Sequence, residues 1–223
     1  MATKQQTPLN HARQVLDIEL AGLKAVRSQL DGQFTATVGM LKEALTRRNK
    51  LVVVGIGKSG NIGQKISATF NSTGATSVLL DPANALHGDI GLLDGGDVVL
   101  ALSYSGESDE LLSLMAAIKK FPVQIVALTG APKSALAKLS DVVLNAKVPK
   151  EACPLTSLQL QARRRCWRWA TPLLWHCCRQ EDLRKKILHV ITLQEPLVAH
   201  FYFMSATLCV PASAWLLHRV RPP

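Results

Sequence analysis

The sequence predicts an α/β protein with a parallel sheet, and two observations carry that prediction. Short runs rich in Val, Leu and Ile alternate with segments of helical composition between residues 51 and 144. Such alternation is typical of βαβ units, in which helices cover a parallel sheet. The first run, Leu51–Gly55, is apolar throughout and ends in glycine, as strands buried on both faces do. At 223 residues and 48% hydrophobic content, the chain has apolar material for one sizeable core.

The expected elements begin with two helices. Apolar residues at spacings of three and four predict an amphipathic helix over residues 10–30, and a second helix is expected over 33–48, where closing basic residues suit a helix C-terminus. Strands follow at 51–55, 76–80, 97–102, 123–128 and 141–144, with helices between them at 59–72, 107–120 and 132–139. Ligands of such sheets bind at the carboxyl ends of the strands, so functional residues are expected in the loops there.

The composition changes after Leu155. Residues 1–155 contain 16 Lys and Arg against 13 Asp and Glu, whereas residues 156–223 contain 10 against 3, so most of the formal charge of +10 belongs to the tail. All 14 glycines precede residue 156, and all four tryptophans follow it. We therefore expect N-terminal helices over 1–48, a core over 49–155, and a basic, Trp-rich tail over 156–223 that does not belong to the domain.

The sequence predicts a cytoplasmic protein. Its N-terminal residues lack the apolar segment of a secretion signal, so the cysteines are expected to be reduced. The apolar stretch Val190–Leu217 is interrupted by Glu195, Pro196 and Pro211, which disfavours a membrane-spanning helix. Strong positive charge can indicate a nucleic acid partner, but here it is confined to the tail. We expect neither nucleic acid nor membrane as a partner.

The loop Gly55–Gly60 follows the first expected strand and opens a helix. A P-loop needs four residues between its first glycine and the Gly-Lys pair, and Val52 stands where that glycine would be. A dinucleotide site matches formally, because the three glycines of the loop satisfy G-x-G-x-x-G and Asp81 follows about 20 residues further on.

A phosphosugar site is the third function open to this loop. Backbone N–H groups of Gly57 and Gly60 and the Ser59 hydroxyl would approach phosphate or sugar oxygens, while Lys58 supplies positive charge. A tight turn with a solvated lysine is the purely structural alternative. The loop alone does not decide between these functions.

The segment Ser103–Ser108 favours the phosphosugar site. Ser103, Ser105 and Ser108 place three hydroxyls, with Gly106, at the start of an expected helix. Hydroxyls and free N–H groups at a helix N-terminus can donate many hydrogen bonds to a dianion, and the helix dipole adds to the attraction. A dinucleotide fold needs no such loop, and a plain helix cap would use only one of the serines.

Four motifs stand in series along the chain: Gly57–Gly60, Ala85–Gly91, Ser103–Ser108 with Glu110, and Lys150–Leu155. Together they resemble arabinose-5-phosphate isomerases of the SIS (sugar isomerase) family over roughly residues 10–155. The resemblance implies a three-layer, flavodoxin-like α/β domain. It also implies reversible interconversion of D-ribulose 5-phosphate and D-arabinose 5-phosphate, which begins synthesis of the Kdo sugar of lipopolysaccharide. It implies a homotetramer, no cofactor and no metal.

The implied reaction moves a carbonyl between C1 and C2 through an enediolate. One partly desolvated carboxylate can take the proton from one carbon and return it to the other. By resemblance Glu110 and Glu151 are the acid/base candidates, unranked by sequence, and Lys58 would stabilise the developing oxyanion. His87 resembles a rim residue that could assist ring opening or bind a metal adventitiously, although a lone histidine is more often neither. Glu110 and its acidic neighbours also stand in a first helical turn, where the dipole favours carboxylates regardless of catalysis.

The resemblance ends at Leu155. Family members continue with Met-Gly-Asp-Ala, Arg-Gly-Phe and His-Pro-Gly-Gly motifs and usually with two CBS modules, and this sequence has none of them. With codons chosen freely and read one base out of register, Trp167–Pro172 can be back-translated to Leu-Ala-Met-Gly-Asp-Ala, and residues 180–188 and 191–195 can yield two further family motifs. Tryptophan has a single codon, which constrains the choice. We therefore expect the tail to be a frameshifted product. A genuine basic extension, with Arg163–Arg165 and nearby tryptophans binding nucleic acid or membrane, is the alternative.

Two functions remain open at this stage. The first is an isomerase whose activity is impaired, because the shifted frame removes a core helix and a family histidine that a neighbouring subunit supplies. The second is a non-catalytic phosphosugar-binding module. The phosphate loops alone do not distinguish the pentose phosphate from other sugar phosphates.

Overall fold

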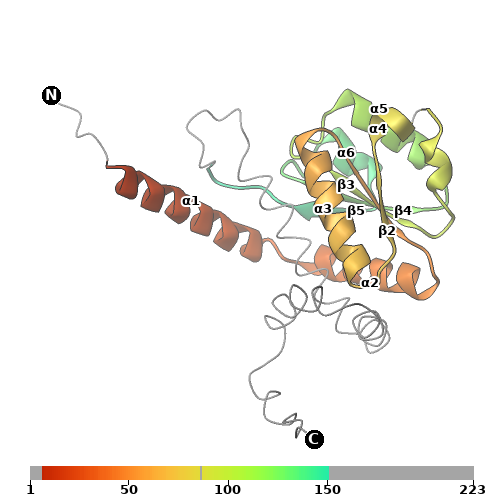
Figure 1. Cartoon of the computed structure of the whole chain (residues 1–223), viewed down its shortest axis with the longest axis horizontal. Coiled ribbons are helices and arrows are strands. Elements are labelled where there is room, and N and C mark those ends of the chain that lie inside the picture. The colour runs from red at the N-terminus through yellow and green to blue at the C-terminus, as the bar shows by residue number, and fades with distance from the viewer. Residues whose placement is uncertain (1–6, 86, 151–223) are drawn as a thin grey trace, which may run out of the picture.

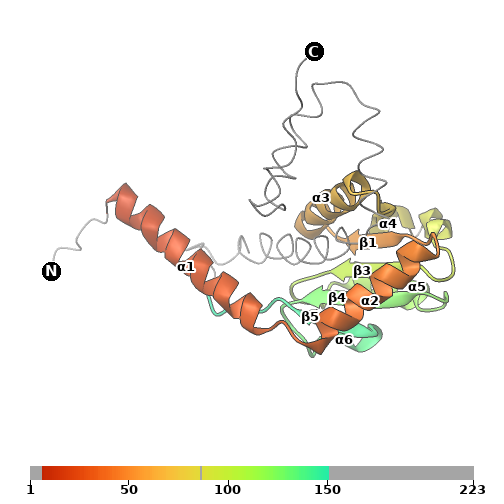
Figure 2. The same ribbon diagram turned by 90° about the horizontal axis from the view of Figure 1, so that it is seen from below.

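The computed structural model describes residues 7–85 and 87–150, and there it forms a parallel sheet between two layers of helices (Figures 1 and 2). The elements are α1 (Pro8–Ser28), α2 (Gly32–Thr46), β1 (Leu51–Gly55), α3 (Lys58–Ser72), β2 (Ser77–Leu80), α4 (Pro82–Ala85), the 3-10 helix η1 (Asp89–Leu92), β3 (Val98–Leu102), α5 (Asp109–Ile118), β4 (Gln124–Thr129), α6 (Ala135–Leu139) and β5 (Val142–Asn145).

The strands lie in the order β2-β1-β3-β4-β5, and every neighbouring pair is parallel. The chain first moves outward from β1 to β2 and then crosses back to β3 on the other side of β1. This order is the one found in flavodoxin-like folds. The predicted fold class, an α/β domain with a parallel sheet, is confirmed.

Alternate residues of each strand serve two separate cores. One core packs strand residues against α2 and α3, and its fully buried members include Val53, Val126 and Phe70. The other packs the alternate residues against α5 and α6, with Val52, Val99 and Leu114 among them. Burial of a large apolar side chain stabilises the fold by about 1.5–3 kcal/mol, so these two layers hold the sheet in place beneath the loops at its edge.

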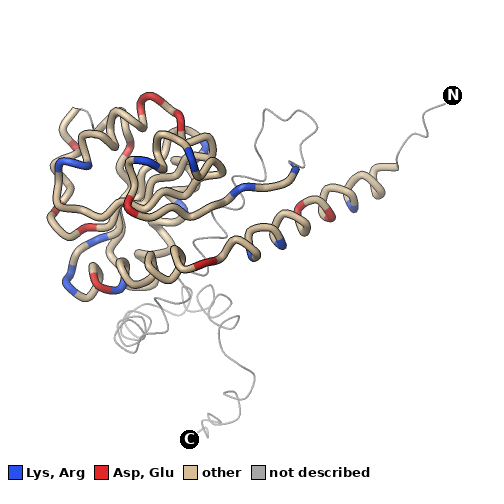
Figure 3. The backbone as a smooth tube through the Cα atoms, turned by 180° about the vertical axis from the view of Figure 1, so that it is seen from behind, with Lys and Arg blue, Asp and Glu red and all other residues tan. Residues whose placement is uncertain are grey.

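Helix α1 extends away from the layered body (Figures 1 and 2). Its C-terminal part is anchored, because Gly22 and Val26 are buried, whereas Leu9, Leu16 and Leu20 are more than half exposed. Despite these leucines, neither α1 nor any other helix among the described residues combines the length and apolarity needed to cross a membrane. Figure 3 shows basic and acidic residues interspersed along α1.

The predicted strands agree with the structure to within one residue, but several helix boundaries differ. Helix α5 begins at Asp109 rather than at residue 107, because Ser108 takes an extended conformation as its N-cap. Helix α6 begins at Ala135 rather than at residue 132, since the Ser134 hydroxyl accepts from Ala137 N–H and caps the helix there. The short helices α4 and η1 were not predicted.

Candidate functional site

The strand order brings two loops together at the carboxyl edge of the sheet. Strands β1 and β3 are neighbours, with Gly55 opposite Leu102 at their ends. The chain leaves these two strands toward opposite sides, which makes this edge the topological switch point where flavodoxin-like folds bind ligands. The loops predicted to bind a phosphosugar, after Gly55 and after Leu102, therefore begin side by side.

The first loop is shaped by its glycines. Gly57 is the N-cap of α3 and takes a positive φ of 53°, which glycine adopts without strain. A Cβ at Gly60 would lie 2.8 Å from the Gly55 carbonyl oxygen, so that position accepts only hydrogen. The N–H groups of Ser59 and Gly60 donate to the Ile56 carbonyl at 3.0 and 3.4 Å. The glycines thus allow helix α3 to start directly against the end of β1.

Two donors at this helix end remain open to a ligand. Among the hydrogen bonds between described residues, none engages the N–H of Gly57 or of Lys58, and α3 has no side-chain cap. Lys58 is exposed. Helix α3 is 15 residues long, so its dipole places partial positive charge here. The arrangement suits an anion next to Gly57, Lys58 and the half-buried Ser59.

The second loop, the serine loop Ser103–Ser108, holds two of its three serines by hydrogen bonds to its own backbone. The buried Ser103 hydroxyl accepts from Gly106 N–H at 3.1 Å, and the exposed Ser105 hydroxyl accepts from Glu107 N–H at 3.4 Å. A hydroxyl that accepts a hydrogen bond keeps its own proton for another acceptor. Ser108 is the N-cap of α5, but its hydroxyl makes no capping bond there. All three serines can therefore donate to a ligand.

The carboxylates predicted near this loop are not equivalent. Glu107 lies before α5, and its Oε1 accepts from Ala135 N–H at 3.0 Å, at the start of α6. Glu110 lies in the first turn of α5 and is exposed. Glu151 and the whole tail, residues 156–223, lie outside the described residues. Of the two acid/base candidates, the structure thus locates only Glu110, in the first turn of the helix that follows the serine loop.

His87 lies in a turn after α4, the segment that follows β2. Its side chain is exposed, and its backbone N–H donates to the Asn84 carbonyl at 2.9 Å. Among the described residues, no backbone hydrogen bond joins it to the two loops. Within the same ranges, His, Cys, Asp and Glu form no group of three or more that could hold a metal ion.

A third loop, unforeseen in the sequence, follows β4 and contacts the serine loop. The hydroxyl of the fully buried Thr129 donates to the Tyr104 carbonyl at 3.2 Å and accepts from Ala131 N–H at 3.1 Å. Gly130 N–H donates to the same Tyr104 carbonyl at 3.0 Å. The Thr-Gly pair at the end of a predicted strand was the available signal, since strand ends in such sheets line ligand sites.

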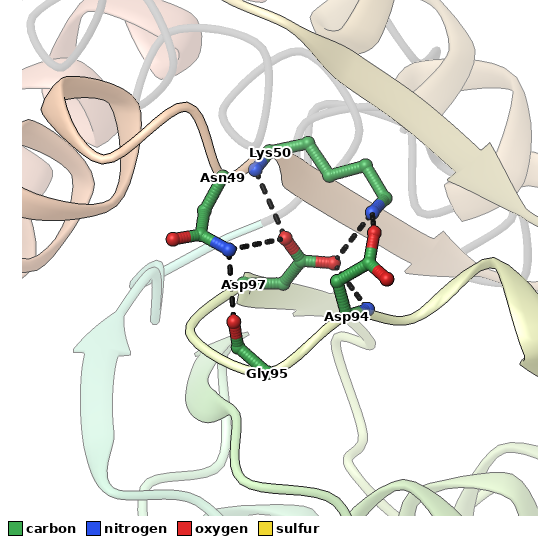
Figure 4. A network of polar contacts seen from close by, with 5 residues as sticks. All are labelled: Asn49, Lys50, Asp94, Gly95 and Asp97. Atoms are coloured by element: carbon green, nitrogen blue, oxygen red, sulfur yellow. Dashed lines mark hydrogen bonds and ion pairs between the residues drawn. The ribbon is translucent and has the colours of Figure 1, made fainter.

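A polar network joins Lys50 and Asp97, which directly precede β1 and β3 at the ends of these strands opposite the two loops. Figure 4 shows its members. The fully buried carboxylate of Asp97 accepts from the N–H groups of Lys50 and Asp94, at 3.0 and 2.9 Å, and pairs with the Lys50 ammonium at 2.9 Å. Burial alone would raise the pKa of Asp97, but these donors hold it below its ordinary value. Burial would lower the pKa of Lys50, and the carboxylates of Asp94 and Asp97 raise it above its ordinary value.

The fold and the two loops define the class of protein. The profile of the SIS domain matches residues 44–162, more than half of the chain, and the chain belongs to that family. The match ends shortly after the predicted boundary at Leu155.

Curated relatives narrow the resemblance further. Proteins named arabinose 5-phosphate isomerase KdsD are 43% identical over 143 residues in Salmonella typhi, 40% over 147 in Pseudomonas aeruginosa and 37% over 155 in Francisella tularensis. These alignments cover 64%, 66% and 70% of this chain. The chain spans only 43–47% of the length of these relatives.

Solved structures agree with this resemblance. A protein of Escherichia coli CFT073 in complex with arabinose 5-phosphate is 26% identical, with a TM-score of 0.72 over 82% of this chain and 94% of that one. A Listeria monocytogenes protein described as a sugar-phosphate isomerase is 25% identical, with a TM-score of 0.77 over 86% of this chain and all of that one.

Proposed function

We propose that this chain interconverts D-ribulose 5-phosphate and D-arabinose 5-phosphate through an enediolate. The observation that carries the proposal is the pairing of two loops at one switch point. One offers unbonded N–H groups and a lysine at a helix N-terminus, and the other offers three serine hydroxyls. A phosphate dianion is stabilised by both kinds of donor. The relatives named arabinose 5-phosphate isomerase and the Escherichia coli complex with arabinose 5-phosphate support the choice of sugar phosphate.

In this proposal the phosphate group lies over the start of α5. Ser103, Ser105 and Ser108 donate their hydroxyl protons to it, and Gly106 lets the backbone approach closely. The sugar then extends toward Gly57, Ser59 and Gly60 at the start of α3. This assignment is supported by the adjacency of the two loops, and it leaves the reacting carbons within the space between both helix ends.

The proton transfers are assigned to Glu110 or Glu151, with Lys58 stabilising the negative charge of the enediolate oxygen and His87 assisting ring opening. A carboxylate that shuttles a proton between C1 and C2 works best when water is excluded from it. Glu110 is exposed in the single chain, so its use as the base requires cover from substrate or from a second subunit.

We extend the proposal to assembly and location. A homotetramer in the cytoplasm, acting at the start of Kdo synthesis for lipopolysaccharide, is the setting that the resemblance implies. The exposed Leu9, Leu16 and Leu20 of α1 support an oligomer, because three such side chains on one protruding helix favour an apolar contact. The tail after Leu155 stays a frameshift product in this proposal, and we expect it to reduce activity.

Binding without turnover is the second candidate function. The exposure of Glu110 favours it, since the described residues supply donors for the phosphate but no desolvated base. A module of this kind would sense the sugar phosphate rather than convert it.

Turnover and binding measured together separate these functions. Carbon-13 NMR of labelled D-ribulose 5-phosphate, incubated with the full chain, should show conversion. Glu110→Gln or Glu151→Gln should slow it by about 100-fold or more, the typical contribution of a general base. The matched control is Glu43→Gln, since Glu43 is an exposed glutamate paired with Arg47 on α2. This variant should convert the substrate at the unmodified rate. Calorimetric binding without conversion would favour the phosphosugar-binding module. If the chain neither binds nor converts the sugar phosphate, both candidate functions are excluded.

A further inference from the structure

The β4–α6 segment, residues 129–136, holds the serine loop at two points. The first is the Tyr104 carbonyl, which receives the Gly130 N–H at 3.0 Å and the Thr129 hydroxyl at 3.2 Å. Thr129 is fully buried, and its oxygen also accepts from Ala131 N–H, so both hydrogen-bonding roles of this hydroxyl are satisfied. The Thr129 side chain therefore joins the two loops to one another.

The second point lies at the other end of the serine loop. Leu136 N–H donates to the Gly106 carbonyl and Ala135 N–H donates to the Glu107 carboxylate, each at 3.0 Å. Gly106 has a φ of 69°, and a Cβ there would lie 2.1 Å from the Ser134 hydroxyl oxygen. The loop thus packs closely against the start of α6, and only glycine fits at position 106.

We propose that the β4–α6 segment is a clamp that fixes the binding conformation of the serine loop, with Thr129 and Glu107 as positioning residues. The proposal rests on the proposed function in assigning phosphate to that loop. Hydroxyls bind an anion well only when the backbone that carries them is already ordered, because ordering it during binding costs conformational entropy. In this arrangement the Glu107 carboxylate accepts the hydrogen bond from Ala135 N–H and does not serve as the base of the isomerisation.

Valine at position 129 tests the clamp, because it keeps the shape of threonine and removes the hydroxyl. Thr129→Val removes both hydrogen bonds of the Thr129 hydroxyl. We expect it to raise both the calorimetric Kd for D-arabinose 5-phosphate and the KM by about tenfold, a change equivalent to one buried hydrogen bond. The kcat should stay within about twofold, since the loss affects ground state and transition state alike. Amide hydrogen exchange at Gly106 and Gly130 should become faster. Thr129→Ser, which keeps the hydroxyl, should restore Kd and exchange.

Thr37→Val is the matched control. Thr37 is equally buried, but its hydroxyl donates to Gln33 within α2, away from the loops. This variant should lower the melting temperature without changing Kd or the exchange of Gly106. An equal loss of binding in Thr37→Val would mean that general stability, not the clamp, sets affinity, and would overturn the proposal.

Glutamine at position 107 separates positioning from catalysis. Glu107→Gln keeps an acceptor oxygen for Ala135 N–H and should retain binding and turnover, whereas Glu107→Ala should raise Kd. If Glu107→Gln binds normally but loses turnover, Glu107 is the base and the positioning assignment is wrong. If the unmodified chain binds no sugar phosphate, the proposed function fails. The clamp is then tested by amide hydrogen exchange alone: if the rates at Gly106 and Gly130 are unchanged in Thr129→Val, the clamp proposal is wrong.

Discussion

Replacing Asp97 by asparagine tests the network at the amino edge of the sheet. The Asp97 carboxylate is fully buried and accepts from four donors: the N–H groups of Lys50 and Asp94, the Lys50 ammonium and the Asn49 amide. Asparagine keeps one acceptor oxygen and turns an NH2 group toward two of those donors. Each lost bond to a charged group costs about 1.5–3 kcal/mol. Asp94 still pairs with the Lys50 ammonium, so we expect Asp97→Asn to lower the free energy of unfolding by about 3 kcal/mol.

Urea denaturation over a range of pH measures this loss. The folded pKa of Asp97 lies below its ordinary value of 3.8, so its stabilising contribution is complete above that pH and is lost as pH falls through the folded pKa. The gap between the unmodified chain and Asp97→Asn should therefore narrow below pH 3.8. Asp94→Asn is the control, because Asp94 is 76% exposed and its ion pair should contribute less than about 1 kcal/mol. Equal losses in both variants, or a gap that persists at low pH, would refute the reasoning.

Three further substitutions test local structure. Arg48→Gly should raise the free energy of unfolding by about 0.5–1 kcal/mol in urea denaturation, because Arg48 closes α2 with a φ of 65° that glycine adopts more readily. Gly60→Ala should lower the melting temperature and cost about 1–3 kcal/mol, since its Cβ would lie 2.8 Å from the Gly55 carbonyl oxygen. Ser103→Ala should weaken calorimetric binding of D-arabinose 5-phosphate by about tenfold, because it removes a ligand donor and the acceptor of Gly106 N–H.

Each of these three predictions has an outcome that would contradict it. A loss of stability in Arg48→Gly would mean that the arginine side chain contributes more than its backbone strain costs. Gly39→Ala, at an open position within α2, is the control for Gly60→Ala and should not destabilise. Unchanged affinity in Ser103→Ala would remove the buried serine from the site.

The strands and the positions of the two loops, Gly55–Gly60 and Ser103–Ser108, were predictable from sequence for a physical reason. A strand buried on both faces must be apolar at every position, and Leu51–Gly55 and 97–102 carry that pattern without interruption except for Asp97. Because the loops directly follow such strands, their place at the carboxyl edge follows from the alternation of strands and helices. The adjacency of β1 and β3 additionally needed the family resemblance, since strand order is a tertiary property.

Other features were not predictable because they depend on partners distant in sequence. Glu107 reads as a capping charge for the helix that follows it, yet it binds the start of α6, 28 residues away. The helices α4 and η1 have four residues each, too few to show a periodic pattern. Thr129 is the last residue of β4, and the Thr-Gly pair there indicates a strand end, but its contact with the Tyr104 carbonyl depends on the folded chain.

Binding of D-arabinose 5-phosphate, followed residue by residue in the full chain by amide NMR, tests most directly whether the two loops form one phosphosugar site. We expect titration to shift the amide signals of Gly57–Gly60 and Ser103–Ser108 together, with one dissociation constant. Lys58→Ala should raise that dissociation constant. It should not shift the amide signals of Lys50 and Asp97, which lie at the opposite ends of β1 and β3 from the loops. Shifts confined to other residues, or none at saturating ligand, would contradict the assignment of the site.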